Sequence, residues 1–391
     1  MVAASTSTAA RRPLKLGMVG GGQGAFIGAV HRIAARIDGE FTLVAGAFSS
    51  DPERAKASAA ELGIDPDRAY ASFNEMASAE AAREDGIDAV AIVTPNHMHF
   101  GPAKAFLEAG IHVLCEKPLT ARLDEAVELA RLAEGSGRIF VLTHNYTGYP
   151  MVRQAREMVA AGELGSIRVV QAEYAQDWLT EAAESSGSKQ AEWRVDPEKA
   201  GAGGALGDIG THAFNLLSFV TGLTLDAVAA DLTAFVPGRR LDDNDHVMLR
   251  FAGGAKGMLW ASQVAPGHEN GLTLRVYGER GGLEWHQENP NQLWFTRFGE
   301  PKQLMTRGGA GAGAAAARVT RTPGGHPEGY LEGFATIYRE AGAAIRAAQD
   351  GEATPEGVLF PTAADGLLAM RFVDACVRSS KADSRWTPLI G

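Results

Sequence analysis

The chain has 391 residues, more than one ordinary hydrophobic core supports, so we expect two domains. Hydrophobic residues make up 45% and charged residues 21%, as in globular proteins, and the net charge of −10 argues against nucleic acid as a partner. Two cysteines cannot build a disulfide framework, and no apolar run is long enough to span a bilayer. We therefore expect a cytoplasmic protein with no membrane partner.

The N-terminal segment, residues 1–13, is small and polar and contains Arg11 and Arg12. A twin arginine can open an export signal, but no apolar segment follows, so we predict a disordered tail. The next residues run as an apolar strand at 16–19, a glycine-rich turn at 20–24, a helix at 27–37 and a second strand at 41–48. This order within about 30 residues is typical of a βαβ unit.

The alternation of helices and strands continues. Further helices are expected at 51–62, 101–109 and 123–135, and strands at 88–93, 111–115 and 139–143. Strands that alternate with helices predict a doubly wound parallel sheet, so we assign residues 14–145 to a dinucleotide-binding Rossmann domain.

The remaining residues, 146–391, have a different pattern. Strands are expected at 167–174, 246–251, 257–264, 272–277 and 292–298, with little helix between most of them. This spacing predicts an α+β domain on a large, open, mainly antiparallel sheet, with helices at about 147–161, 205–221, 328–348 and 362–379 covering one face. Residues 308–317 are rich in Gly and Ala and are interpreted as a mobile surface loop rather than a lid.

The glycine-rich turn lies between a predicted strand and a predicted helix. Glycines there let the backbone approach a pyrophosphate, which rests on the helix N-terminus. The alternative is a tight turn in a domain that binds nothing. The candidate cofactor-binding residues of this turn are Gly20, Gly22, Gln23, Gly24, Ala25, Phe26 and Ile27.

The end of the second strand bears on the choice between NAD and NADP. An NAD-selecting site usually offers an acid there to the ribose hydroxyls, whereas this chain offers Ser49 and Ser50. Ser49, with Arg54 nearby, could instead hold a 2′-phosphate. Asp51, followed by a proline, is interpreted as a helix cap. The cofactor is therefore NAD or NADP, with NADP tolerance favoured slightly.

Lys117, within Glu116-Lys117-Pro118, follows a predicted parallel strand, at the sheet edge where doubly wound folds bind ligands. A lysine held there can hydrogen-bond a reacting oxygen and stabilise alkoxide character. The alternative is a surface lysine after a strand.

Asp208 and His212 stand four residues apart in a predicted helix and would share one face. His212 could accept a hydroxyl proton, with Asp208 orienting its ring; the alternative is a structural pair.

Other polar residues are set aside. His97 and His99 lack further ligands at useful spacing, so no metal site is expected. Cys115 lies in an apolar strand and is interpreted as buried and inert. The acids at 242, 243 and 245 are interpreted as loop charges before a strand.

The combination of motifs resembles the glucose–fructose oxidoreductase, inositol dehydrogenase and rhizopine-catabolism family (Gfo/Idh/MocA). The Glu-Lys-Pro element and the Asp-x-x-x-His element carry most of the specificity, and the matching segments cover nearly the whole chain after residue 14. They are Gly28-Ala29-Val30-His31, Thr94-Pro95-Asn96 with His99, Glu116-Lys117-Pro118, Trp193-Arg194, and Gly203-Gly204 with Asp208 and His212.

The resemblance implies an NAD(P)-dependent dehydrogenase of sugars or polyols, a homo-oligomer (tetramer or dimer), with Lys117, Asp208 and His212 as its catalytic set. It adds Thr94, Pro95, Asn96, His99, Glu116, Lys117, Trp193 and Arg194 to the cofactor side. It adds Lys117, His144, Asn145, Tyr146, Trp193, Asp208, His212 and His326 to the substrate side.

Two features depart from the family pattern. The glycine loop is about three residues longer than usual, which leaves the pyrophosphate contacts open, and the acid after the second strand is absent. The expected substrate is a cyclic sugar, anhydrosugar or inositol. Two other readings stay open: an NAD-dependent glycoside-cleaving enzyme that oxidises C3 transiently, and a non-enzymatic dinucleotide-binding sensor.

Overall fold

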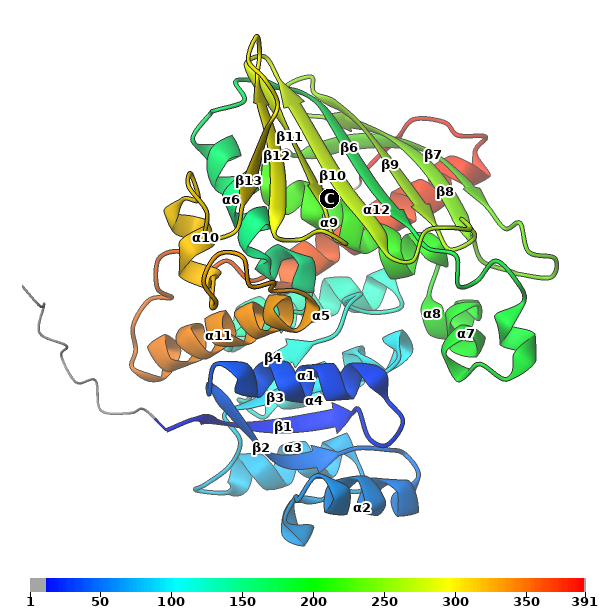
Figure 1. Ribbon diagram of the computed structural model, residues 1–391. Coiled ribbons are helices and arrows are strands. Elements are labelled where there is room, and N and C mark those ends of the chain that lie inside the picture. The colour runs from blue at the N-terminus through cyan, green and yellow to red at the C-terminus, as the bar shows by residue number, and fades with distance from the viewer. Residues whose placement is uncertain (1–11, 390–391) are drawn as a thin grey trace, which may run out of the picture.

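The computed structural model describes residues 12–389. The expected disordered tail lies outside these residues except for Arg12 and Pro13. Two sheets organise the molecule, one of five parallel strands and one of nine mainly antiparallel strands, in the lower and upper parts of Figure 1. Among the described residues, no helix has the length and apolar composition needed to cross a membrane.

The five-stranded sheet confirms the predicted Rossmann fold. Its order is β2-β1-β3-β4-β5, and every pairing is parallel. Parallel strands covered on both faces are continuously apolar, and β3 is buried at every position. The strands are β1 (Leu14–Gly20), β2 (Phe41–Ala47), β3 (Ala89–Val93), β4 (His112–Cys115) and β5 (Phe140–Leu142); the helices are α1 (Phe26–Ile37), α2 (Pro52–Glu61), α3 (Phe73–Ala82), α4 (Phe100–Glu108) and α5 (Leu123–Ser136).

The nine-stranded sheet has the order β13-β12-β11-β10-β6-β9-β8-β7-β14, and only β6 and β9 pair in parallel. Buried and exposed positions alternate along β8, which is the pattern of a sheet with one covered and one open face. The sequence pattern had not indicated β7, β11, β13 or β14. The strands are β6 (Ile167–Ala175), β7 (Leu225–Thr233), β8 (Asn244–Phe251), β9 (Lys256–Ser262), β10 (Gly271–Gly278), β11 (Gly281–His286), β12 (Gln292–Arg297), β13 (Gln303–Thr306) and β14 (Thr387–Pro388).

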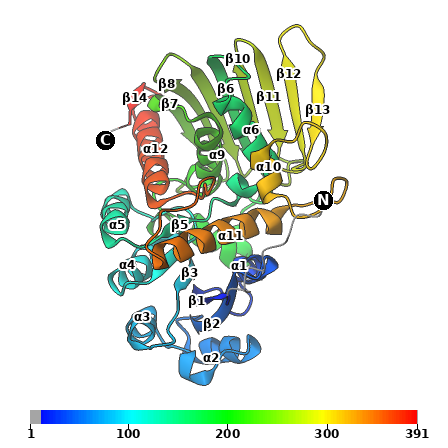
Figure 2. The same cartoon turned by 90° about the vertical axis from the view of Figure 1, so that its left-hand side faces the viewer.

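Three helices cover one face of this sheet: α6 (Pro150–Ala160), α9 (Thr211–Thr221) and α12 (Ala363–Lys381) (Figure 2). Their buried side chains join those of the strands in one hydrophobic core. Two short helices, α7 (Lys189–Arg194) and α8 (Pro197–Ala200), lie in the connection between β6 and α9.

The fourth helix expected on this sheet, α11 (Tyr330–Gln349), lies elsewhere, and that prediction is wrong. It packs against α1, and Phe334, Tyr338 and Ile345 belong to the same core cluster as Val30 of α1 (Figure 1). An amphipathic helix must bury its apolar face, but the pattern does not say against which partner. The C-terminal part of the chain therefore completes the core of the Rossmann domain.

The segment expected to be a mobile loop, residues 308–317, is partly helical. Its last four residues begin α10 (Ala314–Val319), whose Ala316 and Val319 are fully buried. The amide of Gly313, just before α10, donates to Oε1 of Gln154 on α6 at 2.6 Å. A run of alanines has high helix propensity, and the contact with α6 fixes its position.

Candidate active site

Lys117 follows β4 and precedes a cis peptide bond to Pro118. Its ammonium group donates to Oδ1 and to the backbone carbonyl of Asp208, both at 2.9 Å. The side chain is 13% exposed, so the cation is held inside the protein but remains accessible. The Rossmann sheet thus contributes one half of the site and the Asp208 segment contributes the other.

Asp208 lies in a π-helical turn, Leu206–Gly210, which leads into α9. Such turns interrupt the regular backbone ladder and are frequent at functional sites. The Oδ2 atom of Asp208 accepts from Nε of Arg194 and from Nε2 of Gln263, both at 3.0 Å. Burial alone would raise the pKa of the Asp208 carboxyl, but the positive charges of Lys117 and Arg194 outweigh burial and lower it.

His212 has a different partner from the one expected. Its Nδ1 atom lies 3.3 Å from Nδ1 of His144, and the two rings meet edge to face. Among the described residues, the donors to the Asp208 carboxylate are Lys117, Arg194 and Gln263, and His212 is not one of them. The expectation that Asp208 orients the His212 ring is therefore wrong.

Both histidines are buried among aromatic rings. Burial lowers the pKa of His144 to about 3, with a further contribution from the charge of Lys117. Burial and the same lysine also lower the pKa of His212. The ring of Tyr146 packs edge-on against His212 at 4.9 Å. Both imidazoles are therefore neutral at physiological pH.

A hydrogen-bonded wall of polar side chains stands beside His212. The hydroxyls of Tyr146 and Tyr174 lie 2.5 Å apart, and Tyr174 also donates to Oδ1 of Asn270 at 2.7 Å. Two buried groups next to this wall, Nε2 of His144 and Nδ2 of Asn145, have no partner among the described residues. Unpaired buried polar atoms are costly, which points to a polar ligand that satisfies them.

Glu116 is turned into the Rossmann core. Its carboxylate accepts from the hydroxyl of Thr143 and contacts Nε2 of His31 at 2.9 Å, while Nδ1 of His31 lies 2.7 Å from the hydroxyl of Tyr338. Burial would raise the pKa of Glu116, but these hydrogen bonds and the nearby Lys117 lower it. The carboxylate thus joins the residue after β4 to His31 of α1, and His31 in turn contacts Tyr338 of α11.

The glycine loop fits a dinucleotide. A Cβ at Gly28 would lie 2.4 Å from the carbonyl of Gly21, so only glycine allows α1 to start this close to the loop. Residues 22–26, with Arg32, Ser58 and Glu61, line a hollow of about 390 Å³. The predicted residues of this segment run from Gly20, the last residue of β1, to Phe26 and Ile27, the first residues of α1. The side chains of Gln23 and Phe26 are exposed.

Some backbone amides of the extended glycine loop already donate hydrogen bonds within the protein. The amide of Gln23 donates to Oγ of Ser58 at 3.0 Å, and that of Ala25 donates to the carbonyl of Gly22 at 3.1 Å. The amides of Phe26 and Ile27, at the start of α1, donate to no described residue. Helix N-termini bind phosphate groups through such free amides, so these two are the better candidates.

After β2, the predicted cap is confirmed, since Oδ1 of Asp51 accepts from the amide of Arg54 at 2.8 Å. Oγ of Ser49 accepts from the amide of Asp51 at 3.1 Å. The side chains of Ser50 and Arg54 are exposed, so both could reach a ribose or a 2′-phosphate.

The Thr94-Pro95-Asn96 turn is tied to the catalytic strand. The His99 ring, fully buried, lies 2.9 Å from the carbonyl of Thr94 and 2.7 Å from that of Pro118. Both ring nitrogens are thereby occupied, so His99 positions the Lys117–Pro118 segment and leaves no free nitrogen for a cofactor. Nδ2 of Asn96 donates to the carbonyl of Ala200 at 3.0 Å.

Trp193 and Arg194 come from α7. The guanidinium of Arg194 lies 4.2 Å from the centre of the Trp193 ring while its Nε holds Asp208. Trp193 and Arg194 are both half-buried, and their stacking holds α7 against the turn that carries Asp208.

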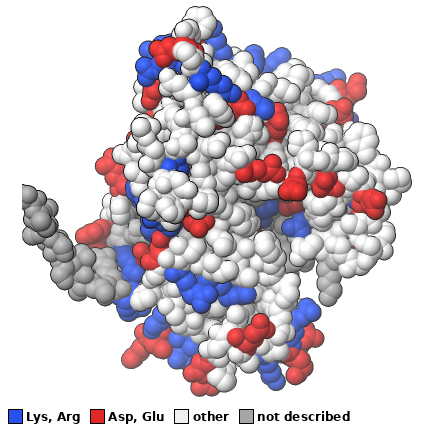
Figure 3. Space-filling model, viewed as in Figure 1, with Lys and Arg blue, Asp and Glu red and all other residues white. Residues whose placement is uncertain are grey.

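Figure 3 shows that the surface is hollowed between the part built on the nine-stranded sheet and the Rossmann part, with basic side chains at the edge of the hollow.

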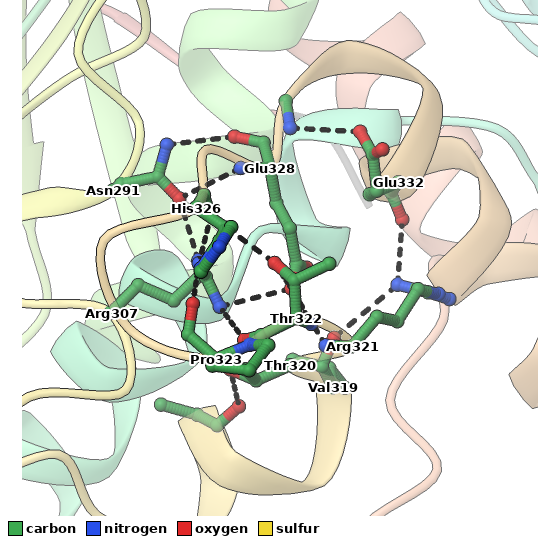
Figure 4. Close-up of polar contacts among 12 residues, drawn as sticks. Asn291, Arg307, Val319, Thr320, Arg321, Thr322, Pro323, His326, Glu328 and Glu332 are labelled. Carbon is green, nitrogen blue, oxygen red and sulfur yellow. Dashed lines mark hydrogen bonds and ion pairs between the residues drawn. The ribbon is translucent and has the colours of Figure 1, made fainter.

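His326 lies on the segment between α10 and α11 and is exposed. Buried Arg307 holds this segment: it donates to the carbonyls of Thr322, Pro323 and His326 and pairs with Glu328 at 3.0 Å (Figure 4). Among the described residues, the His326 side chain forms no hydrogen bond or ion pair with the residues around Lys117.

The sequence analysis missed several residues of the site. Gln263, Tyr174 and Asn270 reach it through the strand ends of β9, β6 and β10, and no local pattern marks them. The acids at 242, 243 and 245 were interpreted as loop charges, which is wrong. Asp243 and Asp245 are buried, and Asp243 accepts from the amides of Phe235 and Val236. Asp242 accepts from the amides of Gly204 and Leu206, at the start of the turn that carries Asp208.

A Rossmann sheet, a glycine loop that fits a pyrophosphate and a lysine–aspartate–histidine site define a nicotinamide-nucleotide oxidoreductase. Residues 14–146 match the oxidoreductase family with an NAD-binding Rossmann fold, and residues 152–284 match the GFO/IDH/MocA C-terminal domain. The chain belongs to this GFO/IDH/MocA oxidoreductase family.

Several relatives match along almost the whole chain. The uncharacterized oxidoreductase YfiI of Bacillus subtilis is 37% identical over 96% of both chains. A Sinorhizobium meliloti oxidoreductase structure is 59% identical with a TM-score of 0.88, over 96% of this chain and 99% of that one. An inositol dehydrogenase homolog from Azotobacter vinelandii, complexed with NAD+, is 38% identical with a TM-score of 0.92, over 96% and 97%.

Proposed function

We propose that this protein is an NAD(P)-dependent dehydrogenase that acts on a CH–OH group of a cyclic sugar, anhydrosugar or inositol. The observation that carries the proposal is the pairing of Lys117 with Asp208, beside the neutral base His212 and the unpaired buried donors of His144 and Asn145. A substrate with several hydroxyls would satisfy these donors and give specificity. Relatives include a levoglucosan dehydrogenase, 29% identical over 95% of this chain, and the Azotobacter protein with bound NADH and myo-inositol.

In the proposed reaction, the nicotinamide ring supplies the hydride acceptor when the cofactor is bound. Nε2 of His212 takes the proton of the substrate hydroxyl. The Lys117 ammonium, held by Asp208, donates a hydrogen bond to the same oxygen as it gains negative charge. Arg194 and Gln263 keep the Asp208 carboxylate oriented, so the Lys117 side chain that it holds stays fixed in place.

We further propose NAD as the main cofactor, with NADP tolerated. Four solved structures, two of the Azotobacter protein and two of levoglucosan dehydrogenase, contain NAD+ or NADH. After β2, Asp51 is used as the cap of α2, which leaves Ser49 and Ser50 in place of an acid that would repel a 2′-phosphate, and no cluster of bases that would require one. Ser49 and Arg54 are the residues that would accept the 2′-phosphate. Ser49→Asp should reduce turnover with NADP much more than with NAD, and equal losses with both cofactors would contradict this assignment.

The first test is absorbance at 340 nm with NAD and NADP against inositols, aldoses and anhydrosugars, with Lys117→Ala as control. Turnover that disappears in the variant supports the proposal. If no substrate turns over while NAD still binds, a glycoside assay with tightly bound NAD separates a glycoside-cleaving enzyme from a sensor.

We also propose that the protein forms a homodimer or homotetramer through the open face of the nine-stranded sheet. Met248, Met258 and Tyr277 are at least 40% exposed on this face. Trp260, two residues after Met258 in β9, points to the same face and lines a hollow of about 740 Å³. None of the predicted site residues lines this hollow. Large exposed apolar faces mark interaction sites. Light scattering should give two or four subunits, and Met258→Glu should lower that number; a monomeric parent would contradict the proposal.

A further inference from the structure

The contact between His144 and His212 suggests a role for a residue outside the lysine–aspartate–histidine set. We propose that His144 is a positioning residue that selects the tautomer of His212, so that Nε2 of His212 is free to act as the base. This inference rests on the proposed dehydrogenase function. It assigns to His144 the role that the sequence spacing had suggested for Asp208.

The first argument is that the aspartate is already occupied. Its Oδ1 accepts from Lys117, and its Oδ2 accepts from Arg194 and Gln263. An imidazole that acts as a base needs a second group to fix which nitrogen carries the proton. Among the described residues, the one group within hydrogen-bond distance of Nδ1 of His212 is Nδ1 of His144, at 3.3 Å.

The second argument concerns the protons. Both rings are neutral, because burial and the charge of Lys117 disfavour the imidazolium form, and the charges of Glu116 and Asp208 only partly oppose this effect. Two neutral imidazoles that meet through Nδ1 must be one donor and one acceptor. The pair therefore has two arrangements, and each fixes both tautomers.

In the first arrangement, His212 donates its Nδ1–H to His144, and Nε2 of His212 keeps its lone pair. In the second, His144 donates, and Nε2 of His212 carries a proton and cannot accept another from a hydroxyl. The buried Nε2 of His144 lacks a protein partner in both, so it does not favour the second. The geometry points to the first arrangement, because Nε2 of His212 donates to no described residue and is the atom left to face the substrate.

The first arrangement also needs no rearrangement during the reaction. The substrate O–H bond breaks, and its proton forms a new N–H bond at Nε2 of His212. The resulting imidazolium keeps its Nδ1–H directed at Nδ1 of His144, which remains an acceptor. The hydride leaves the same carbon for the nicotinamide, so the carbonyl product, the reduced cofactor and one proton on His212 balance the reaction.

The test is ¹⁵N NMR of the protein labelled at histidine, with His212→Gln used to assign the His212 signals. In the unaltered protein, we expect Nδ1 of His212 to be protonated and Nε2 to be unprotonated. His144→Asn keeps an oxygen acceptor, and His144→Leu removes it. We expect the tautomer to persist in the asparagine variant and to be lost in the leucine variant.

Turnover gives an independent readout. His144→Leu should lower kcat about 10-fold or more, because general-base catalysis contributes roughly 10²–10⁴-fold. It should also raise KM, because it removes the Nε2 group that we propose meets a substrate hydroxyl. His144→Asn should recover most of that loss. A protonated Nε2 in the unaltered protein, or equal kcat values for the leucine and asparagine variants, would overturn the proposal. The NMR result requires no substrate, so it stands even if the proposed function fails.

Discussion

Removal of the negative charge at Asp208 should destabilise the protein strongly, and the isosteric change Asp208→Asn tests this. The side chains of Lys117, Asp208 and Arg194 are 13%, 14% and 23% exposed. In the variant, the cations of Lys117 and Arg194 would remain mostly buried but would no longer face a carboxylate. Breaking a buried ion pair costs about 3–5 kcal/mol. Because Arg194 keeps some solvent contact, we expect a loss at the lower end of this range, about 3 kcal/mol.

The pH dependence gives a second, signed test. The folded-state pKa of Asp208 is lowered, so its contribution to stability is complete above the unfolded value of about 3.9 and is lost as the pH falls toward the folded value. The stability difference between the unaltered protein and Asp208→Asn should therefore be largest near neutrality. It should shrink by about 1.4 kcal/mol for each pH unit below about 4.

Urea unfolding followed by tryptophan fluorescence, repeated at several pH values, measures both quantities. Asp124→Asn is the matched control, because Asp124 pairs with Arg122 on the surface and its loss should leave the midpoint unchanged. Equal midpoints for Asp208→Asn and the unaltered protein at neutral pH would refute the account of the site as a buried charge cluster. A difference that does not decrease in acid would refute the assigned pKa direction.

Three further changes test other parts of the structure. Gly28→Ala should abolish NAD binding in titration calorimetry, because its Cβ would meet the carbonyl of Gly21 at 2.4 Å; normal affinity would contradict the close approach. Glu340→Gln should lower the free energy of unfolding by about 3–5 kcal/mol, since it leaves Arg153 buried without its charge partner, and an unchanged urea midpoint would argue otherwise. Tyr330, the first residue of α11, lies near enough to Tyr146, Glu116 and Asp208 for their charges to add to burial in raising its pKa, and its hydroxyl has no partner among the described residues. We therefore predict that this hydroxyl meets the substrate: Tyr330→Phe should leave stability unchanged but raise KM about 5-fold, and an unaltered KM would contradict this placement.

Local pattern predicted most of the fold. Strands such as β3 are apolar throughout because helices cover both faces of a parallel sheet, so their positions were readable from sequence. Strand β13 was not, since it is short and largely exposed. Helix α11 was recognised as a helix, but its partner was misjudged, because periodicity gives the width of a buried stripe and not the surface that it meets.

The residues of the candidate site also fall into those that local sequence predicts and those that it does not. Lys117 and Asp208 were identified because each stands at a position with local meaning, the end of a parallel strand and the start of a helix. Their grouping in one catalytic set came from the family resemblance, and their direct contact, between residues 91 positions apart, was not predicted. The partnership of His144 with His212 joins residues 68 positions apart and depends on packing that no spacing reveals. The buried Asp245 was missed because an acid before a strand usually faces solvent.

The position of α11 has a consequence for the order in which the molecule is made. Its side chains Phe334, Tyr338 and Ile345 fill the core between α1 and the first strands, and the hydroxyl of Tyr338 contacts the ring of His31. During synthesis, β1 and α1 leave the ribosome well before α11, yet their core is completed only when α11 has followed. A chain cut short before α11 would expose that apolar surface. Residues as far apart as His31 and Tyr338, 307 positions in the sequence, therefore belong to one folding unit.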